Sequence, residues 1–250
     1  MNKNELINYL NSYLKISDYP DDNSKNWLQV DNSRQEIKKI WYAVDATSYI
    51  FDKAIEKWVD MVICHHGLFW GFDPVVIGTH YDRISKLIKN DIALYGCHLP
   101  LDWHEEVGNN IVLLNKFAEI MDIRIPKIEK YEYSFGLRFD DTIKFEDLEK
   151  YCDVIWLEKW LYNFWNLDEI RSVYFSSGGW LFHAKFAREN NFDLLVTWEW
   201  AHYEMSLAKE LSQSVLIWWH YETEIFGVQA LAEKLNKDFG VEIVFLDEKY

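Results

Sequence analysis

The chain has 250 residues, of which 49% are hydrophobic and 27% charged, and a formal net charge of -15 at pH 7. This length and apolar content suffice for a sizeable core and exclude a disordered chain. Because the negative charge repels phosphate backbones and acidic membrane surfaces, a nucleic-acid partner is not expected.

The cysteine pattern and the absence of long apolar runs indicate a cellular compartment. Cys64, Cys97 and Cys152 are an odd number without regular spacing, which favours reduced thiols over a disulfide framework. The first residues lack the apolar segment of a signal peptide, and no run approaches the roughly 18 to 20 apolar residues of a membrane span. We therefore expect a cytoplasmic protein with no membrane partner.

The first part of the chain alternates helices and strands. Apolar residues at helical spacing predict a helix over residues 6–14, followed by an acidic segment, 19–23, that we interpret as a loop. A predicted strand at 37–45 leads to Thr47 as the N-cap of a helix, and an apolar strand follows at 61–64. Strands that are apolar on both faces are typical of buried parallel sheets, so this pattern indicates an α/β fold.

Three predicted strands end in histidine. The strand-end histidines are the doublet His65 and His66, then His98, then His220. Ligands bind at the carboxyl edge of open α/β sheets, because the loops there line a crevice. Imidazole is the commonest metal ligand in proteins, although an isolated histidine pair can also belong to a solvated loop. Position and residue type together therefore predict a metal site.

Two carboxylates extend this set of ligands. Asp102 lies four residues after His98, and the intervening Pro100 predicts an extended or turn segment here rather than a helix face. Glu224 lies four residues after His220, which places both on one helix face if a helix begins at His220. Six ligands are too many for one zinc ion. Divided three and three, they suit two divalent metal ions, with zinc, iron and manganese as candidates.

The pattern pauses near residue 126, which predicts two parts, 1–125 and 126–250. The second part again alternates helices and strands, and its strands are predicted at 133–139, 173–176, 194–197, 215–217 and 241–246. The expected fold class is α/β, with two interlinked parts whose mixed or parallel sheets are flanked by helices. The metal site is expected at strand carboxyl ends between the parts, and the C-terminal helix and strand are expected to pack on the first part.

Three segments carry a resemblance that covers essentially the whole chain. They read HHGLFWG, YGCHLPLDWHEEVGNN and HYETEIFGVQALAEKL. In order and content they resemble the signature blocks of the Nif-three-like family, whose members are commonly described as GTP cyclohydrolase I type 2 homologues. The resemblance implies a dinuclear metal centre between two α/β parts, and a ring-shaped homohexamer. By motif match it puts the metal ligands at His65, His66, His98, Asp102, His220 and Glu224, with Asp102 or Glu224 bridging the ions.

Two functions fit these residues. The first is a metal-dependent hydrolase of GTP cyclohydrolase type, in which two ions activate water and polarise a bond of a nucleotide or pterin-like substrate. For proton transfer or substrate orientation we consider His104, Glu199 and Tyr221. The second is a metal-binding regulatory or interaction protein without turnover. The sequence has no P-loop, Gly-rich dinucleotide fingerprint or nucleophile elbow to support another enzyme class.

Tryptophan is unusually frequent, with 13 residues against 10 glycines. The chain departs from the family pattern by carrying tryptophan where a small residue is usual, at Trp27, Trp103, Trp180, Trp198 and Trp219. Glycine beside a metal often adopts a positive φ or allows close backbone approach, which tryptophan cannot do without strain. We therefore expect either shifted loops that make the pocket a narrow aromatic slot, or ligands that stay in place while substrate access shrinks.

The remaining cysteines and histidines have simpler interpretations. Cys64 and Cys97 directly precede candidate ligands, but neighbouring strand residues point to opposite faces, so both are expected to be buried as small hydrophobes. Three further histidines lack a partner at ligand spacing and are interpreted as solvated. They are His80, His183 and His202.

Overall fold

The computed structural model describes eight stretches of the chain. They are residues 1–71, 75–125, 127–131, 134–154, 160–176, 183–197, 201–217 and 220–245. The chain forms two compact units, Met1–Gly108 with Glu224–Tyr250, and Asn109–Thr223. The division falls at Gly108 and not at the expected residue 126, because helix α5 (Asn109–Ile120) packs on strand β6 (Ser134–Lys144).

The first unit is built on a five-stranded sheet in the order β1-β4-β3-β2-β11. Its strands are β1 (Trp27–Val30), β2 (Lys39–Asp45), β3 (Met61–His66), β4 (Ala93–Gly96) and β11 (Glu242–Phe245). All are parallel except β1, which runs antiparallel to β4. The C-terminal strand therefore completes the sheet of the first unit. Because β3 and β4 are parallel neighbours, the histidines that end them meet at one edge of the sheet.

Helices surround this sheet in the first unit. They are α1 (Lys3–Tyr13), the 3-10 turn η1 (Ile16–Asp18), α2 (Ser48–Glu56), α3 (Gly78–Lys89), α4 (Leu99–Asp102) and α9 (His220–Phe239), whose first turn belongs to the second unit. As predicted, Thr47 caps α2, with its Oγ1 accepting a hydrogen bond from the Ile50 amide at 3.3 Å. The prediction of an extended or turn segment at His98–Asp102 is wrong, because Pro100 lies in the first turn of α4, where proline is tolerated.

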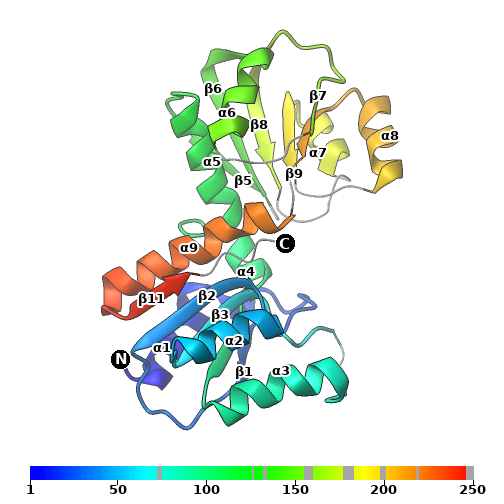
Figure 1. The fold of residues 1–250 in the computed structure, drawn as a ribbon. Helices are drawn as coiled ribbons and strands as arrows, with labels where there is room; N and C mark the ends of the chain where they lie inside the picture. The colour runs from blue at the N-terminus through cyan, green and yellow to red at the C-terminus, as the bar shows by residue number, and fades with distance from the viewer. Residues whose placement is uncertain are drawn as a thin grey trace. The chain divides into compact units, whose positions relative to one another are not determined.

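Alternate residues of the strands face different helices. Val62 and Cys64 point into an apolar cluster with α2 and α3, which lie together in front of the sheet in Figure 1. On the other face, the Tyr95 hydroxyl donates to Asn11 Oδ1 of α1 at 2.8 Å. Since β2, β3 and β4 are buried on both faces, the edge where they end is held rigidly.

The second unit has a mixed six-stranded sheet in the order β5-β6-β8-β9-β10-β7. Its strands are β5 (Lys127–Tyr131), β6, β7 (Trp160–Tyr162), β8 (Glu169–Phe175), β9 (Leu194–Thr197) and β10 (Ser214–Ile217). Besides α5, its helical elements are η2 (Phe145–Asp147), α6 (Leu148–Val154), α7 (His183–Glu189) and α8 (His202–Glu210). The predicted α/β class, with two sheets flanked by helices, is thereby confirmed. None of the helices in the described stretches is long and apolar enough to cross a bilayer.

Candidate metal centre

Five of the six predicted metal ligands converge within the first unit. Two groups each bring their ligand atoms within 4.8 Å of one another, and they are His65, His66 and His98, and His65, Asp102 and Glu224. The donors come from the ends of β3 and β4, from the last residue of α4 and from α9. His65, Asp102 and Glu224 are 0%, 3% and 1% exposed, so this imidazole and both carboxylates are shielded from water.

Histidine and carboxylate side chains face each other directly in this centre. Nε2 of His65 lies 3.3 Å from Oε1 of Glu224 and 3.5 Å from Oδ2 of Asp102. The second oxygen of Glu224 lies 3.2 Å from Nε2 of His66. One carboxylate therefore presents a different oxygen to each member of the histidine doublet.

Each of the three clustered histidines is held through Nδ1 by an acceptor outside the cluster. His65 Nδ1 lies 3.0 Å from the carbonyl oxygen of Cys97. His66 Nδ1 lies 2.8 Å from Oδ1 of Asp45, and His98 Nδ1 lies 2.9 Å from Oδ1 of Asp22. Metal-binding histidines typically donate the other ring N–H to a carbonyl or carboxylate in this way, which fixes the ring and its tautomer.

The buried charges favour a cation at this position. Burial by itself lowers the pKa of His65, but the negative charges of Asp102 and Glu224 outweigh it and raise this pKa to about 10. The carboxylates thus stabilise positive charge next to Nε2 of His65. Nitrogen and oxygen donors without thiolate suit zinc, iron or manganese, so the residues fit the divalent ion that the motif implies.

The cysteines that precede these ligands take no part in the donor set. Cys64 and Cys97 are fully buried, and burial raises the pKa of both thiols well above the usual value. This confirms their interpretation as small buried hydrophobes, because a thiol must lose its proton to bind metal.

His220 lies one helical turn before Glu224, at the first residue of α9. Because α9 begins at His220, the condition stated for the i,i+4 pair is met, and both side chains project from the same face of the helix. Tyr221, one of the three residues considered for catalysis, follows at the second position of this helix and is half-buried. Glu199, another of the three, lies outside the described residues.

The third catalytic candidate, His104, is occupied by backbone contacts. Its Nε2 donates to the carbonyl oxygen of Tyr13 at 2.9 Å, and its Nδ1 accepts from the amides of Glu106 and Val107, each at 3.2 Å. Burial lowers the pKa of His104 and so keeps the ring neutral. These contacts favour a role in holding α1 against the segment after α4 over a role in proton transfer.

Two of the tryptophans expected to strain the site are described by the structure, and neither is strained. Trp103 has a φ of -105° and is buried beside the ring of Tyr19, and Trp27 lies in strand β1 with 56% of its surface exposed. Trp180, Trp198 and Trp219 lie outside the described residues. Among the described residues, the tryptophan with a positive φ, at 56°, is instead Trp58, which directly follows the C-cap of α2.

Three residues near the histidines were not among the predicted site residues. Asp45 is the strand neighbour of His66 in the β2–β3 register, so its contact follows from strand pairing. Asp22 lies in the segment interpreted as a loop without function, and that interpretation missed its bond to His98. Trp70 places its ring 4.9 Å from that of His98, in an edge-on arrangement.

Two of the histidines interpreted as solvated are instead buried or half-buried. His183 is 7% exposed and lies 3.2 Å from the hydroxyl of Tyr174, and His80 is half-buried against the ring of Phe69. His202 is exposed on α8, as predicted. The burial of His183 and His80 comes from packing against Tyr174 and Phe69, which the spacing of histidines along the chain does not indicate.

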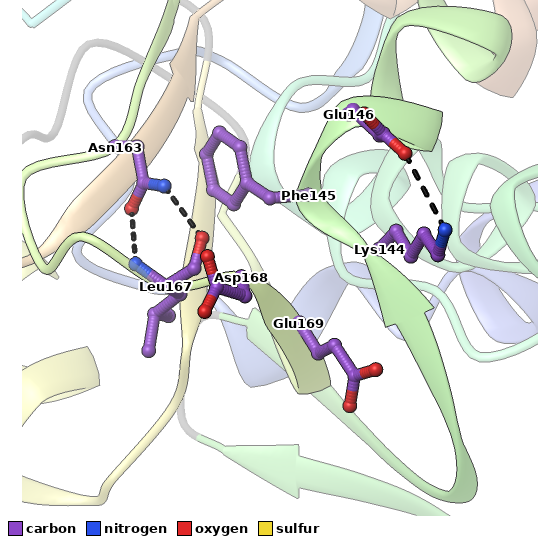
Figure 2. Close-up of a pocket in the computed structure, with 7 residues that line it drawn as sticks. All are labelled: Lys144, Phe145, Glu146, Asn163, Leu167, Asp168 and Glu169. Atoms are coloured by element: carbon purple, nitrogen blue, oxygen red, sulfur yellow. Dashed lines mark hydrogen bonds and ion pairs between the residues drawn. The ribbon is translucent and has the colours of Figure 1, made fainter.

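A separate pocket of about 470 Å³ lies in the second unit, and Figure 2 shows its lining side chains. Asn163 donates to the carbonyl oxygen of Leu167 at 2.7 Å and accepts from its amide at 2.8 Å, while Lys144 lies 3.6 Å from Glu146. These two pairs lie within the wall of the pocket, and its lining contains neither histidine nor cysteine. The two groups of candidate metal ligands described above, by contrast, lie wholly in the first unit.

Comparisons with known proteins find relatives and solved structures that match nearly the whole chain. The chain is 36% identical over 255 residues to the GTP cyclohydrolase 1 type 2 homolog of Pyrococcus abyssi, covering 99% of this chain and 98% of that relative. The crystal structure of TTHA1606 from Thermus thermophilus matches with 35% identity and a TM-score of 0.86, over 100% and 99% of the two chains. A protein ybgI of unknown function matches with 28% identity and a TM-score of 0.88, over the same shares. The model of the Duf34/NIF3 (NGG1p interacting factor 3) family matches residues 1–250, which confirms the resemblance seen in the motifs, and the chain belongs to this family.

Proposed function

We propose that this chain binds two divalent metal ions at the candidate centre and uses them to hydrolyse a nucleotide or pterin-like small molecule. One observation carries the proposal. Three histidines, each held through Nδ1, gather with two buried carboxylates at one sheet edge. The name of the Pyrococcus abyssi relative, a GTP cyclohydrolase 1 type 2 homolog, supports the choice of substrate class.

The ions would be held by the six residues that the motif match assigned. Those residues are His65, His66, His98, Asp102, His220 and Glu224. Because Glu224 presents one oxygen to His65 and the other to His66, it suits a shared ligand better than Asp102 does. A bound divalent ion lowers the pKa of water and acts as a Lewis acid on the bond that is attacked.

The chain's own residues would supply position and charge. Burial of His65, Asp102 and Glu224 excludes bulk water and strengthens their electrostatic effect on a ligand. Tyr221 and Glu199 remain the candidates for orienting a substrate or moving a proton. We also propose the ring-shaped homohexamer implied by the resemblance, which light scattering coupled to gel filtration would test.

A non-catalytic, metal-binding regulatory or interaction protein is the second candidate. The contacts of His104 favour it, because both ring nitrogens of this catalytic candidate are bonded to backbone groups. In the hydrolase, by contrast, proton transfer would depend on Tyr221 and Glu199.

Metal content and turnover test the two candidates separately. Protein purified without chelator or affinity-tag metal should contain two equivalents of metal, and less than one equivalent would contradict a dinuclear centre. His65→Ala should lose metal while keeping its fold, whereas the exposed control His202→Ala should keep it. Loss of the intact guanine ring from GTP would support the hydrolase, and two bound ions without turnover would support the regulator.

A further inference from the structure

We infer that Asp22 is the positioning residue that sets the orientation and tautomer of His98 and anchors the helical turn that carries Asp102. The inference rests on the proposed metal binding and adds a residue that no ligand motif contains. Asp22 lies before β1, 76 positions ahead of His98 in the chain. Its side chain is 1% exposed, although it belongs to an acidic segment that looks like a solvated loop in the sequence.

The two oxygens of the Asp22 carboxylate each have two hydrogen-bond partners. Oδ1 lies 2.9 Å from Nδ1 of His98 and accepts from the amide of Ser24 at 2.9 Å. Oδ2 accepts from Nδ2 of Asn26 at 2.7 Å and from the amide of Leu99 at 3.0 Å. A carboxylate has about four acceptor positions, so this set saturates it. Burial raises the pKa of Asp22, but the bonds from His98, Asn26 and Ser24 outweigh it and lower this pKa.

The same loop holds His98 at two further points. The backbone amide of His98 donates to Oδ1 of Asn26 at 2.6 Å, and Trp70 packs edge-on against its ring. The loop is itself tied to the chain after His66, because the amide of Lys25 donates to the carbonyl oxygen of Phe69 at 3.0 Å. His98 is therefore fixed at its backbone amide by Asn26, at Nδ1 by Asp22 and at the side of its ring by Trp70.

This arrangement selects one tautomer of His98. A carboxylate that accepts from Nδ1–H leaves Nε2 with its lone pair and makes that nitrogen a better metal ligand. Asp22 also bonds to the amide of Leu99, the first residue of α4, whose last residue is Asp102. One buried carboxylate thus positions two of the proposed ligands, His98 and Asp102.

Nitrogen NMR of the metal-free protein tests the inference without using metal or activity. Long-range 1H–15N spectra report which ring nitrogen of a histidine carries the proton. Wild-type His98 should show the Nδ1–H form, and Asp22→Ala should shift it towards the Nε2–H form that is usual in solution. Asp22→Asn retains an acceptor oxygen at Oδ1 and should keep the Nδ1–H form. The control Asp31→Asn removes an exposed loop carboxylate that pairs with Lys3, and should change nothing.

Zinc affinity provides the second measurement, by competition with a chromophoric chelator. Loss of a partner that orients a metal ligand typically costs 10- to 100-fold in affinity, so Asp22→Ala should bind zinc about 10- to 100-fold more weakly. Asp22→Asn should show a smaller loss and Asp31→Asn none. If Asp22→Ala does not fold, the near-isosteric Asp22→Leu, which also removes both acceptor oxygens, decides, and an unchanged His98 tautomer with wild-type zinc affinity in that variant would overturn the inference.

The outcomes separate this inference from the proposed function. Wild-type protein that binds no zinc would contradict the proposed function, while a tautomer shift in Asp22→Ala would still establish the positioning role. Wild-type protein that binds zinc, with His98 unchanged in Asp22→Ala, would overturn the inference and leave the proposed function standing. An Nε2–H form of His98 in the wild-type protein would overturn it as well.

Discussion

Nε2 of His65 lies 3.3 Å from Oε1 of Glu224, with both side chains fully or almost fully buried. A buried imidazole and a buried carboxylate at this distance need a proton or a metal ion between or beside them to offset the cost of burial. Because Asp102 lies 3.5 Å from the same nitrogen, the negative charge exceeds what one proton on His65 compensates. This excess is the electrostatic basis for binding a divalent cation.

Glu224→Gln should weaken metal binding and lower the pKa of His65. The amide keeps the shape of the side chain but removes one of the two charges that raise this pKa. We expect zinc affinity to fall at least as far as the 10- to 100-fold that loss of an outer partner costs. Metal analysis and an NMR titration of His65 measure the two effects. Glu233→Gln, at an exposed position on the same helix, serves as the control and should match the wild type.

The stability of the metal-free protein should fall as the pH rises above neutrality. The pKa of His65 is raised from 6.5 to about 10 in the folded state, so its stabilising contribution is complete below pH 6.5 and is lost as the pH rises through 10. Melting temperatures of chelator-treated protein across this range would measure the loss. The dependence should be weaker in Glu224→Gln, and equal slopes in the two proteins would contradict the assignment to His65.

His183 should produce a pH effect of the opposite sign in the second unit. Burial lowers its pKa from 6.5 to about 4, so the folded state keeps the ring neutral beside Tyr174. Between these pH values the unfolded chain binds more protons, and stability is lost as the pH falls, by up to about 3 kcal/mol. Denaturant titrations should show this loss in the wild type and a smaller one in His183→Gln. His202→Gln, at an exposed site, should behave like the wild type.

Trp58→Gly should stabilise the protein. Trp58 has a φ of 56° and is 86% exposed, so it bears the cost of the left-handed conformation with little burial to offset it. Glycine adopts this conformation freely, and we expect a gain of about 1 kcal/mol in the free energy of unfolding. Trp27→Gly, within strand β1, should instead lose about 1 kcal/mol, because glycine weakens strands. Chemical denaturation of both variants would show whether the signs differ.

The residue at position 58 also shows whether the surplus of tryptophan is present in the protein that the cell makes or arises only from reading its codons as tryptophan. Tryptophan and glycine codons differ by one base, so a codon that the source organism reads as glycine would place glycine at position 58 of the working protein. Mass spectrometry of a peptide that covers this position, from protein isolated from its natural source, would decide. A glycine at position 58 would mean that the natural protein has no backbone strain there. A tryptophan would mean that the natural protein carries this strain.

Several features could be predicted from local patterns in the sequence. Thr47 was predicted as a helix cap, because a cap depends on neighbouring residues. The shared face of His220 and Glu224 was predicted on the condition that a helix begins at His220, and α9 does begin there. The strand at Leu194–Thr197 was predicted with its observed bounds. The short helix α4 after His98 was missed because proline is tolerated in the first turn of a helix as well as in extended segments.

The division of the chain could not be predicted in the same way. Residues 124–127 interrupt the helix and strand pattern, and that interruption suggested a boundary. Which sheet a helix covers depends on packing between distant segments, and α5 packs with β6 of the second unit. Near the site, the role of His104 depended on the carbonyl oxygen of Tyr13, 91 positions away.

The sequence by itself determined which residues could bind metal, and the tertiary structure decided how they are held. His65, His66 and His98 follow apolar strands, and parallel strands end at one sheet edge, so their convergence is implied by local pattern and topology. Asp22 has no such signature, because an aspartate in an acidic loop looks the same whether it faces water or a ring nitrogen. Only the path of that loop against the segment after β3 brings it to His98, since its hydrogen bonds span 76 positions of the chain.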